Sequence, residues 1–106
     1  MLKFEEWQKL DIRIAEIVAA ERVAGTDRLL RLVVDLGGEQ RQLVAGIGAV
    51  YTPEELIGRK IPVFVNLEPK QLKGIDSQGM LLAADDGGKP VLLQPERDVP
   101  NGSRIK

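Results

Sequence analysis

The sequence contains no cysteine and no histidine among its 106 residues. Without cysteine the chain can form no disulfide, no thiolate nucleophile and no sulfur-ligated metal site. Without histidine it lacks the usual general base near neutral pH and the commonest transition-metal ligand. We therefore expect no catalytic residue, no bound metal and no cofactor, and a binding module is favoured over an enzyme.

Long apolar runs and aromatic side chains are also scarce. No apolar stretch approaches the roughly 20 residues that a membrane-spanning helix needs, so no membrane association is expected. Glu5 and Glu6 lie where a secretory signal would have its apolar region, and this pattern predicts a cytoplasmic protein. The only aromatic residues are two phenylalanines, one tyrosine and one tryptophan.

The net charge is −1 and the isoelectric point is near 5.5. These values exclude a protein that coats nucleic acid through bulk positive charge, so any site for a polyanion must be local. Between positions 59 and 74 the basic residues outnumber the single acid, whereas acids are in excess between 85 and 98. The bases of the first stretch are Arg59, Lys60, Lys70 and Lys73, against Glu68.

Strand-like runs separated by turn residues dominate the chain and predict an all-β protein with a single domain over residues 1–106. In the first run the apolar alternation changes phase between Ile14 and Ile17, which predicts a β-bulge in a long strand. Gly37 and Gly38 predict a hairpin between the second and third runs. The five runs cover residues 11–20, 29–36, 40–45, 60–66 and 78–84.

A short helix is predicted between the third and fourth runs. Thr52 can cap it, Pro53 suits its first position, Glu55 completes a capping box and Gly58 can end it. Five strands with a helix at this point is the order of an OB-fold barrel. Residues 4–10 predict an additional N-terminal helix, and residues 91–93 an additional C-terminal strand.

The polar segment from Asn66 to Met80 carries the strongest indication of function, because OB-folds bind oligomers beside this loop. Lys70 and Lys73 are cations, and Ser77 and Gln78 offer neutral hydrogen bonds. Ammonium groups with small polar donors suit a phosphodiester backbone better than base edges. Arg22 and Arg28, in the loop between the first two strands, would close the other side of the groove.

The same residues also have an ordinary structural interpretation. Two lysines in a loop are usually solvated surface, Met80 at a strand start is more often core, and Asn66 could bond loop backbone. No aromatic ring lies in either loop, although proteins that bind single strands use rows of stacking rings. A folded RNA held by shape and phosphates is therefore favoured.

Four segments of the chain resemble the tRNA-binding domain of methionyl-tRNA synthetase C-termini, its free-standing homologues and related synthetase cofactors. In chain order they are DIRIAEI, TDRLLRLVVDLG, LVAGIGAVYTPEELIGRKIPVFVNLEPKQLKGIDSQGMLLAA and LLQPERDVPNGSRIK. The most specific part is NLEPKQLKGIDSQGM, within the third segment. The resemblance implies a non-catalytic OB-fold dimer that holds the outer corner of tRNA by shape and assists a synthetase.

By position, the resemblance implies tRNA contacts from Lys73, Ser77 and Met80, with Asn66 bracing the loop and Arg28 acting from the opposite side. Lys70, as a cation, and Gln78, as a hydrogen-bonding group, are two further candidates for tRNA contact in the same loop. The family often has arginine at position 73 and a basic residue at 71, where this chain has Gln71. The loss of a bidentate fork and of a charge predicts weaker or more salt-sensitive binding.

The resemblance also implies a dimer interface made by the N-terminal segment and the extra C-terminal strands. The candidates are Phe4, Trp7, Val91, Leu92 and Leu93. For Trp7 the alternative is an intramolecular cap on the barrel. A dimer would double a modest phosphate-binding surface.

Two other functions stay open. Small export-related chaperones resemble this chain in FEEWQKLDIR and LLQP, and would bind unfolded peptide on the same surface, although GIDSQGM follows the tRNA-binding branch. An assembly module that tethers a synthetase to its partners is the third interpretation.

Overall fold

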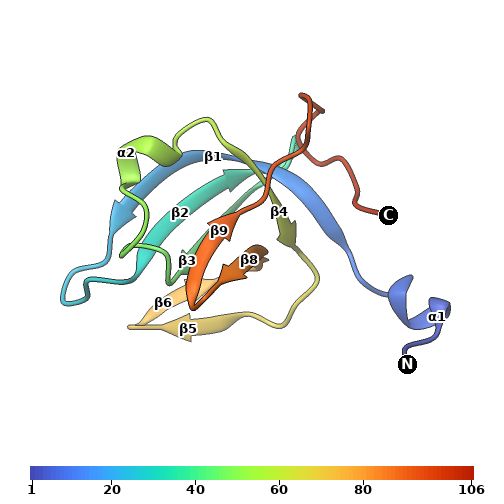
Figure 1. Cartoon of the computed structure of the whole chain (residues 1–106), viewed down its shortest axis with the longest axis horizontal. Helices are drawn as coiled ribbons and strands as arrows, with labels where there is room; N and C mark the ends of the chain where they lie inside the picture. The colour runs from blue at the N-terminus through green and yellow to red at the C-terminus, as the bar shows by residue number, and fades with distance from the viewer.

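The structure, a computed structural model, describes all residues 1–106 and consists mainly of short antiparallel strands with two one-turn helices (Figure 1). In chain order the elements are α1 (Phe4–Trp7), β1 (Ile12–Arg22), β2 (Leu30–Asp35), β3 (Gln40–Ala45), α2 (Pro53–Leu56), β4 (Lys60–Phe64), β5 (Lys70–Leu72), β6 (Ile75–Ser77), β7 (Met80–Leu81), β8 (Ala83–Asp86) and β9 (Lys89–Leu92). None of the helices is long and apolar enough to cross a membrane.

A curled five-stranded sheet in the order β3-β2-β1-β4-β7 forms a nearly closed barrel, which confirms the predicted OB-fold. The long strand β1 pairs with β2 and with β4. Its register against β2 shifts between Ile17 and Ala19, so β1 does contain a bulge, at Val18, which lies just after the predicted change of phase between Ile14 and Ile17. The bulge bends β1, so that its first half can pair with β4 and its second half with β2.

Alternate residues of the strands fill the barrel interior. Leu30, Leu32 and Val34 of β2 are completely buried, and the residues between them are half-buried on the outer face. Leu56 of α2 closes one end and is also completely buried. This single apolar core gives the surface loops a rigid support.

The helix α2 begins and ends where its sequence predicts. The backbone N–H of Thr52 donates to Glu55 Oε2 at 2.9 Å, and the Thr52 hydroxyl donates to the same oxygen at 3.0 Å. These bonds hold the pKa of Glu55 below its ordinary value. Gly58, with φ +89°, ends the segment.

The prediction of one strand over residues 78–84 is wrong. The chain pairs with β4 only through β7, and then leaves the barrel as β8 to pair with β9. Leu82 N–H still donates to the Pro62 carbonyl at 3.1 Å. Proline has no N–H with which to return the bond, so the ladder ends there. The predicted C-terminal strand is present as β9, and residues 67–77 contain the β5–β6 hairpin in place of an open loop.

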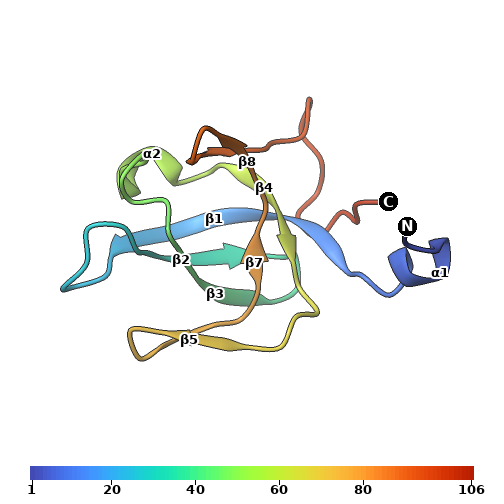
Figure 2. The same ribbon diagram turned by 60° about the horizontal axis from the view of Figure 1, so that its bottom comes forward.

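The terminal segments meet at one end of the barrel. The predicted N-terminal helix is present as α1, which projects away from the strands in both views (Figures 1 and 2). The C-terminal segment runs beside the first half of β1, where Ile14 N–H donates to the Ser103 carbonyl at 2.8 Å and Ile105 N–H to the Ile12 carbonyl at 2.8 Å.

Candidate nucleic-acid interface

The β5–β6 hairpin presents Lys73 at its tip. Leu72 pairs with Ile75, so Lys73 and Gly74 form a two-residue turn. Their φ angles are +53° and +76°, as a type I′ turn requires, and Lys73 is the only non-glycine residue with positive φ in the chain. The hairpin thereby holds a cation outward on a tight, well-defined turn.

Lys70 and Lys73 are exposed and form no ion pair or side-chain hydrogen bond. The other bases of the cationic stretch are neutralised within the protein. Arg59 Nη2 lies 3.6 Å from Glu55 Oε1, and Lys60 Nζ lies 2.8 Å from Asp98 Oδ1. The positive charge that remains available between residues 59 and 74 is therefore on the two hairpin lysines.

Three of the predicted residues line one hollow beside the hairpin. Lys70, Ser77 and Met80 surround a space of about 350 Å³. Met80 is 48% exposed there, so it does not belong to the core. The other lining residues, mostly apolar, are Val44, Leu67, Glu68, Leu72 and Gly79. An ammonium group on the rim of an apolar hollow can contact a phosphate while the hollow accepts sugar or base.

Ser77 and Gln78 anchor the hairpin to the barrel. Ser77 is 6% exposed, and its Oγ accepts a bond from Val44 N–H at 3.0 Å and donates to the Gly79 carbonyl at 3.0 Å. Gln78 Oε1 accepts from Gln42 N–H at 2.9 Å. Direct contact of either side chain with RNA stays a prediction, whereas their bonds give both an anchoring role.

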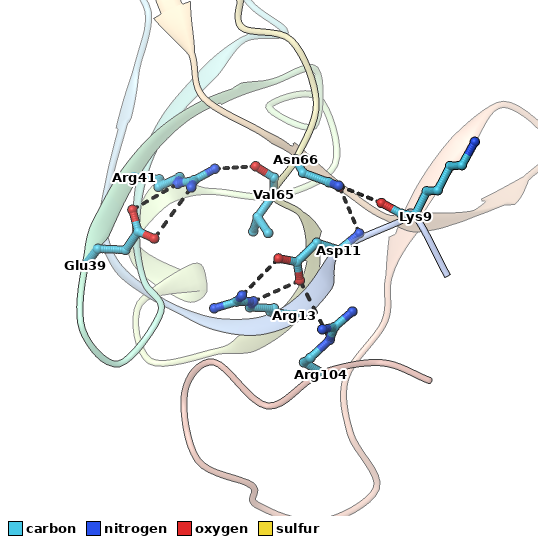
Figure 3. Close-up of polar contacts among 8 residues, drawn as sticks. All are labelled: Lys9, Asp11, Arg13, Glu39, Arg41, Val65, Asn66 and Arg104. Carbon is cyan, nitrogen blue, oxygen red and sulfur yellow. Dashed lines mark hydrogen bonds and ion pairs between the residues drawn. The ribbon is translucent and has the colours of Figure 1, made fainter. Parts of the chain in front are cut away.

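Asn66 lies beside the segment that precedes β1. Its Oδ1 accepts a bond from Asp11 N–H at 2.8 Å, and its Nδ2 donates to the Lys9 carbonyl at 2.7 Å (Figure 3). These bonds fix the segment before β1 and do not reach the hairpin. A contact between Asn66 and RNA stays a prediction.

Arg28 lies in the β1–β2 loop, at the same end of the molecule as the hairpin tip in both views (Figures 1 and 2). Its side chain is exposed and forms no ion pair, and its carbonyl accepts a bond from Gly48 N–H at 2.7 Å. Arg22 Nη1 donates to the Gly48 carbonyl at 2.9 Å. The structure thus places Arg28 and Lys73 on two loops of one end, with β2 and β3 between them.

A second cationic cluster, which the sequence argument did not identify, surrounds Asp11 (Figure 3). Arg13 Nε lies 2.9 Å from Asp11 Oδ1, and Arg104 Nε lies 4.0 Å from the same oxygen. The Arg13 hydrogen bond, with a smaller contribution from Arg104, holds the pKa of Asp11 below its ordinary value. Nearby, Arg41 pairs with Glu39 at 3.2 Å. These arginines face the protein's own acids and carbonyls.

The sequence argument also missed Arg31 and Gln42, which connect the sheet to the hairpin. Gln42 Nε2 donates to the Asp76 carbonyl at 2.8 Å, and Arg31 Nε donates to Gln42 Oε1 at 2.7 Å. The signal in the sequence is the run Gln40–Gln42, in which three consecutive polar residues enter an otherwise apolar strand.

Relatives of this chain are long enzymes. It is 50% identical over 106 residues to the methionine–tRNA ligase of Methanothrix thermoacetophila, a match that covers 100% of this chain and 16% of that protein. It is 49% identical over 104 residues to the methionine–tRNA ligase of Caldanaerobacter subterraneus, covering 98% of this chain and 16% of that protein. The chain therefore spans about a sixth of the length of these curated relatives.

Two solved structures share the whole fold. The first is a methionyl-tRNA synthetase related protein from Pyrococcus horikoshii, with a TM-score of 0.95 and 37% identity over 100% of this chain and 98% of that one. The chaperone CsaA from Bacillus anthracis has a TM-score of 0.92 and 37% identity over 100% of this chain and 99% of that one. The family model described as a putative tRNA binding domain matches residues 12–104. This chain belongs to that tRNA-binding domain family.

Proposed function

We propose that this chain is a non-catalytic module that binds tRNA through shape and backbone contacts, with little sequence specificity. Lys70 and Lys73 contact phosphates, Met80 contacts the adjoining sugar or base, and Arg28 contributes from the β1–β2 loop. Ser77 and Gln78 serve the same site by holding the hairpin in place. The absence of imidazole and thiol groups, which most catalytic sites use, agrees with a binding role.

The observation that carries this proposal is the pair of unneutralised ammonium groups on the hairpin, Lys70 at the rim of an apolar hollow and Lys73 at the tip. The chain has a net charge of −1, so binding of a large polyanion has to rely on such a local group of cations. No aromatic residue lines the hollow, which favours a folded RNA over an extended single strand with stacked bases.

A homodimer is part of the proposal. Phe4 is 70% exposed on α1, and Val91 and Leu93 are 42% and 43% exposed, whereas Leu92 packs against the core. Trp7 is 36% exposed beside the C-terminal residues. Exposed apolar side chains on α1 and at β9 suit a self-complementary interface. Two copies would present two hairpins to one tRNA and raise the avidity.

The proposal also names a partner enzyme, a methionine–tRNA ligase, and a compartment, the cytoplasm. Because the curated relatives are methionine–tRNA ligases, the module is proposed to raise the affinity of such an enzyme for its tRNA, either as part of the same chain or as a separate subunit. A protein that assists aminoacylation works where tRNA is charged, and the cytoplasm is the compartment we propose.

A peptide-binding chaperone is the second candidate, and the similarity to CsaA at a TM-score of 0.92 supports it. The apolar hollow with Met80 at its rim would also accept an apolar side chain of an unfolded peptide. The two candidates differ in electrostatics, because phosphate binding depends steeply on salt and apolar peptide binding does not.

The test is a titration of fluorescently labelled unfractionated tRNA with the wild-type chain at several salt concentrations, with a reduced, unfolded protein as the competing ligand. The proposal predicts that many tRNAs bind with similar affinity and that this affinity falls markedly as salt increases. An equimolar amount of the unfolded protein should not displace the tRNA. Binding of the unfolded protein alone would favour the chaperone. Analytical ultracentrifugation of the wild type and of Phe4→Ser tests the dimer, which the substitution should weaken.

A further inference from the structure

The hairpin is docked on the edge of strand β3 by two side-chain acceptors and a single backbone bond, in place of a regular ladder. The outward backbone N–H groups of Gln42 and Val44 donate to Gln78 Oε1 and Ser77 Oγ at 2.9 and 3.0 Å. The Gln42 carbonyl accepts from Gln78 N–H at 2.8 Å. These bonds satisfy an otherwise open sheet edge and close the barrel.

The side chain of Gln42 continues this docking across the outer face of the sheet. Its amide group donates to the Asp76 carbonyl in the hairpin and accepts from Arg31 Nε on β2, at 2.8 and 2.7 Å. Arg31 Nη1 in turn donates to Glu21 Oε1 at 3.2 Å, near the end of β1. A continuous polar row therefore joins β1, β2, β3 and the hairpin.

Each end of this row lies next to a segment that carries an exposed cation. Glu21 lies just before the β1–β2 loop that carries Arg28, and Asp76 lies in β6, next to the turn that carries Lys73. We propose that Gln42 is a positioning residue for tRNA binding, which holds the hairpin, and with it Lys70 and Lys73, at a fixed place relative to the β1–β2 loop. This inference rests on the proposed tRNA-binding function.

Positioning matters here because the hairpin is too small to be stable alone. Its two strands have three residues each, and isolated two-stranded hairpins are marginal in water. If the hairpin moved freely, tRNA binding would have to order it and lose affinity to that entropy cost. Gln42 carries no charge, so it strengthens binding without adding a phosphate contact.

The test compares Gln42→Met with Gln40→Met. Both replace glutamine by an unbranched side chain of similar size on β3, but Gln40 is exposed and its side chain makes no hydrogen bond. Gln42→Met should weaken tRNA binding by about three- to tenfold, as expected for one or two lost hydrogen bonds, with an unchanged salt slope. Hydrogen exchange over residues 67–79 should become faster, while exchange in β1 and β2 stays as in the wild type.

A double-mutant cycle separates positioning from a general loss of stability. If Gln42 acts through the hairpin lysine, Gln42→Met should cost less affinity in a Lys73→Ala background than in the wild type. Equal costs in both backgrounds, or a Gln42→Met protein that binds tRNA as tightly as Gln40→Met, would overturn the positioning role. A wild-type chain that binds no tRNA would instead contradict the proposed function itself.

Discussion

The two cationic regions of this molecule differ in what their charges face. Arg13, at the start of β1, forms a bond of 2.9 Å with Asp11, and Arg41, on β3, is 3.2 Å from Glu39. On the β5–β6 hairpin, Lys70 faces solvent at the rim of an apolar hollow, and Lys73 faces solvent at the tip. The arginines are therefore paired within the protein, and the hairpin lysines are charges that remain available to a polyanion.

The largest effect is expected from removing both hairpin charges. Lys70→Ala combined with Lys73→Ala should weaken tRNA binding by at least about tenfold at a fixed, moderate salt concentration, because each charged contact contributes more than a neutral one. The melting temperature should stay close to that of the wild type, since neither lysine has an intramolecular partner. The measurement is fluorescence anisotropy with labelled tRNA, alongside thermal unfolding. Lys89→Ala, an exposed lysine on the β8–β9 hairpin across the barrel, is the control and should bind normally (Figure 2).

Around the start of β1, substitutions are expected to change the stability of the fold and not tRNA binding. Asn66→Ala removes both bonds that hold the segment before β1 and should lower the free energy of unfolding by about 1–3 kcal/mol. Asn66→Asp keeps an acceptor for Asp11 N–H but loses the donor to the Lys9 carbonyl, so its loss should be smaller. Urea unfolding measures both. An Asn66→Ala protein as stable as the wild type would show that this junction contributes nothing.

Acid should remove the contribution of Asp11. Its pKa is held down in the folded state by Arg13, so its stabilisation is complete above the unfolded value near pH 4 and is lost as pH falls through the lower folded value. Asp11→Asn should therefore melt a few degrees below the wild type at pH 7, and this difference should shrink progressively as pH falls below about 4. A difference that stays constant down to pH 2 would contradict this assignment. The measurement is thermal unfolding across the pH range.

The smallest effect is expected from Lys73→Arg. Arginine keeps the charge and adds a bidentate fork for phosphate, so tRNA binding should tighten by about two- to threefold without a change in the salt slope. Isothermal titration at matched salt can resolve this change. Weaker binding than in the wild type would show that the site prefers a compact ammonium group to a planar guanidinium.

The periodic parts of the fold could be predicted from the sequence. The change of phase between Ile14 and Ile17 indicated the bulge, and Thr52 to Gly58 indicated α2, because both are local patterns. The local sequence could not predict that residues 78–84 are divided between β7 and β8. This division depends on Pro62, which lies in a different strand and withholds the returning N–H.

The candidate site was only partly visible in the sequence, for a similar reason. A count of charges identified the stretch from 59 to 74 but could not tell that Lys60 is neutralised by Asp98, 38 positions away. The anchoring bonds of Ser77 likewise depend on a strand edge that exists only after folding. Residue types indicated the kind of ligand, and the tertiary pairing decided which charges are free to bind it.

The salt dependence of tRNA binding by Lys73→Ala tests this central claim most directly. If the free ammonium at the hairpin tip pairs with a phosphate, the substitution should lower the magnitude of the slope of log K against log salt by about one, for all tRNAs alike. Lys89→Ala should leave the slope unchanged. A Lys73→Ala protein with the wild-type slope would contradict the account and remove the hairpin from the interface.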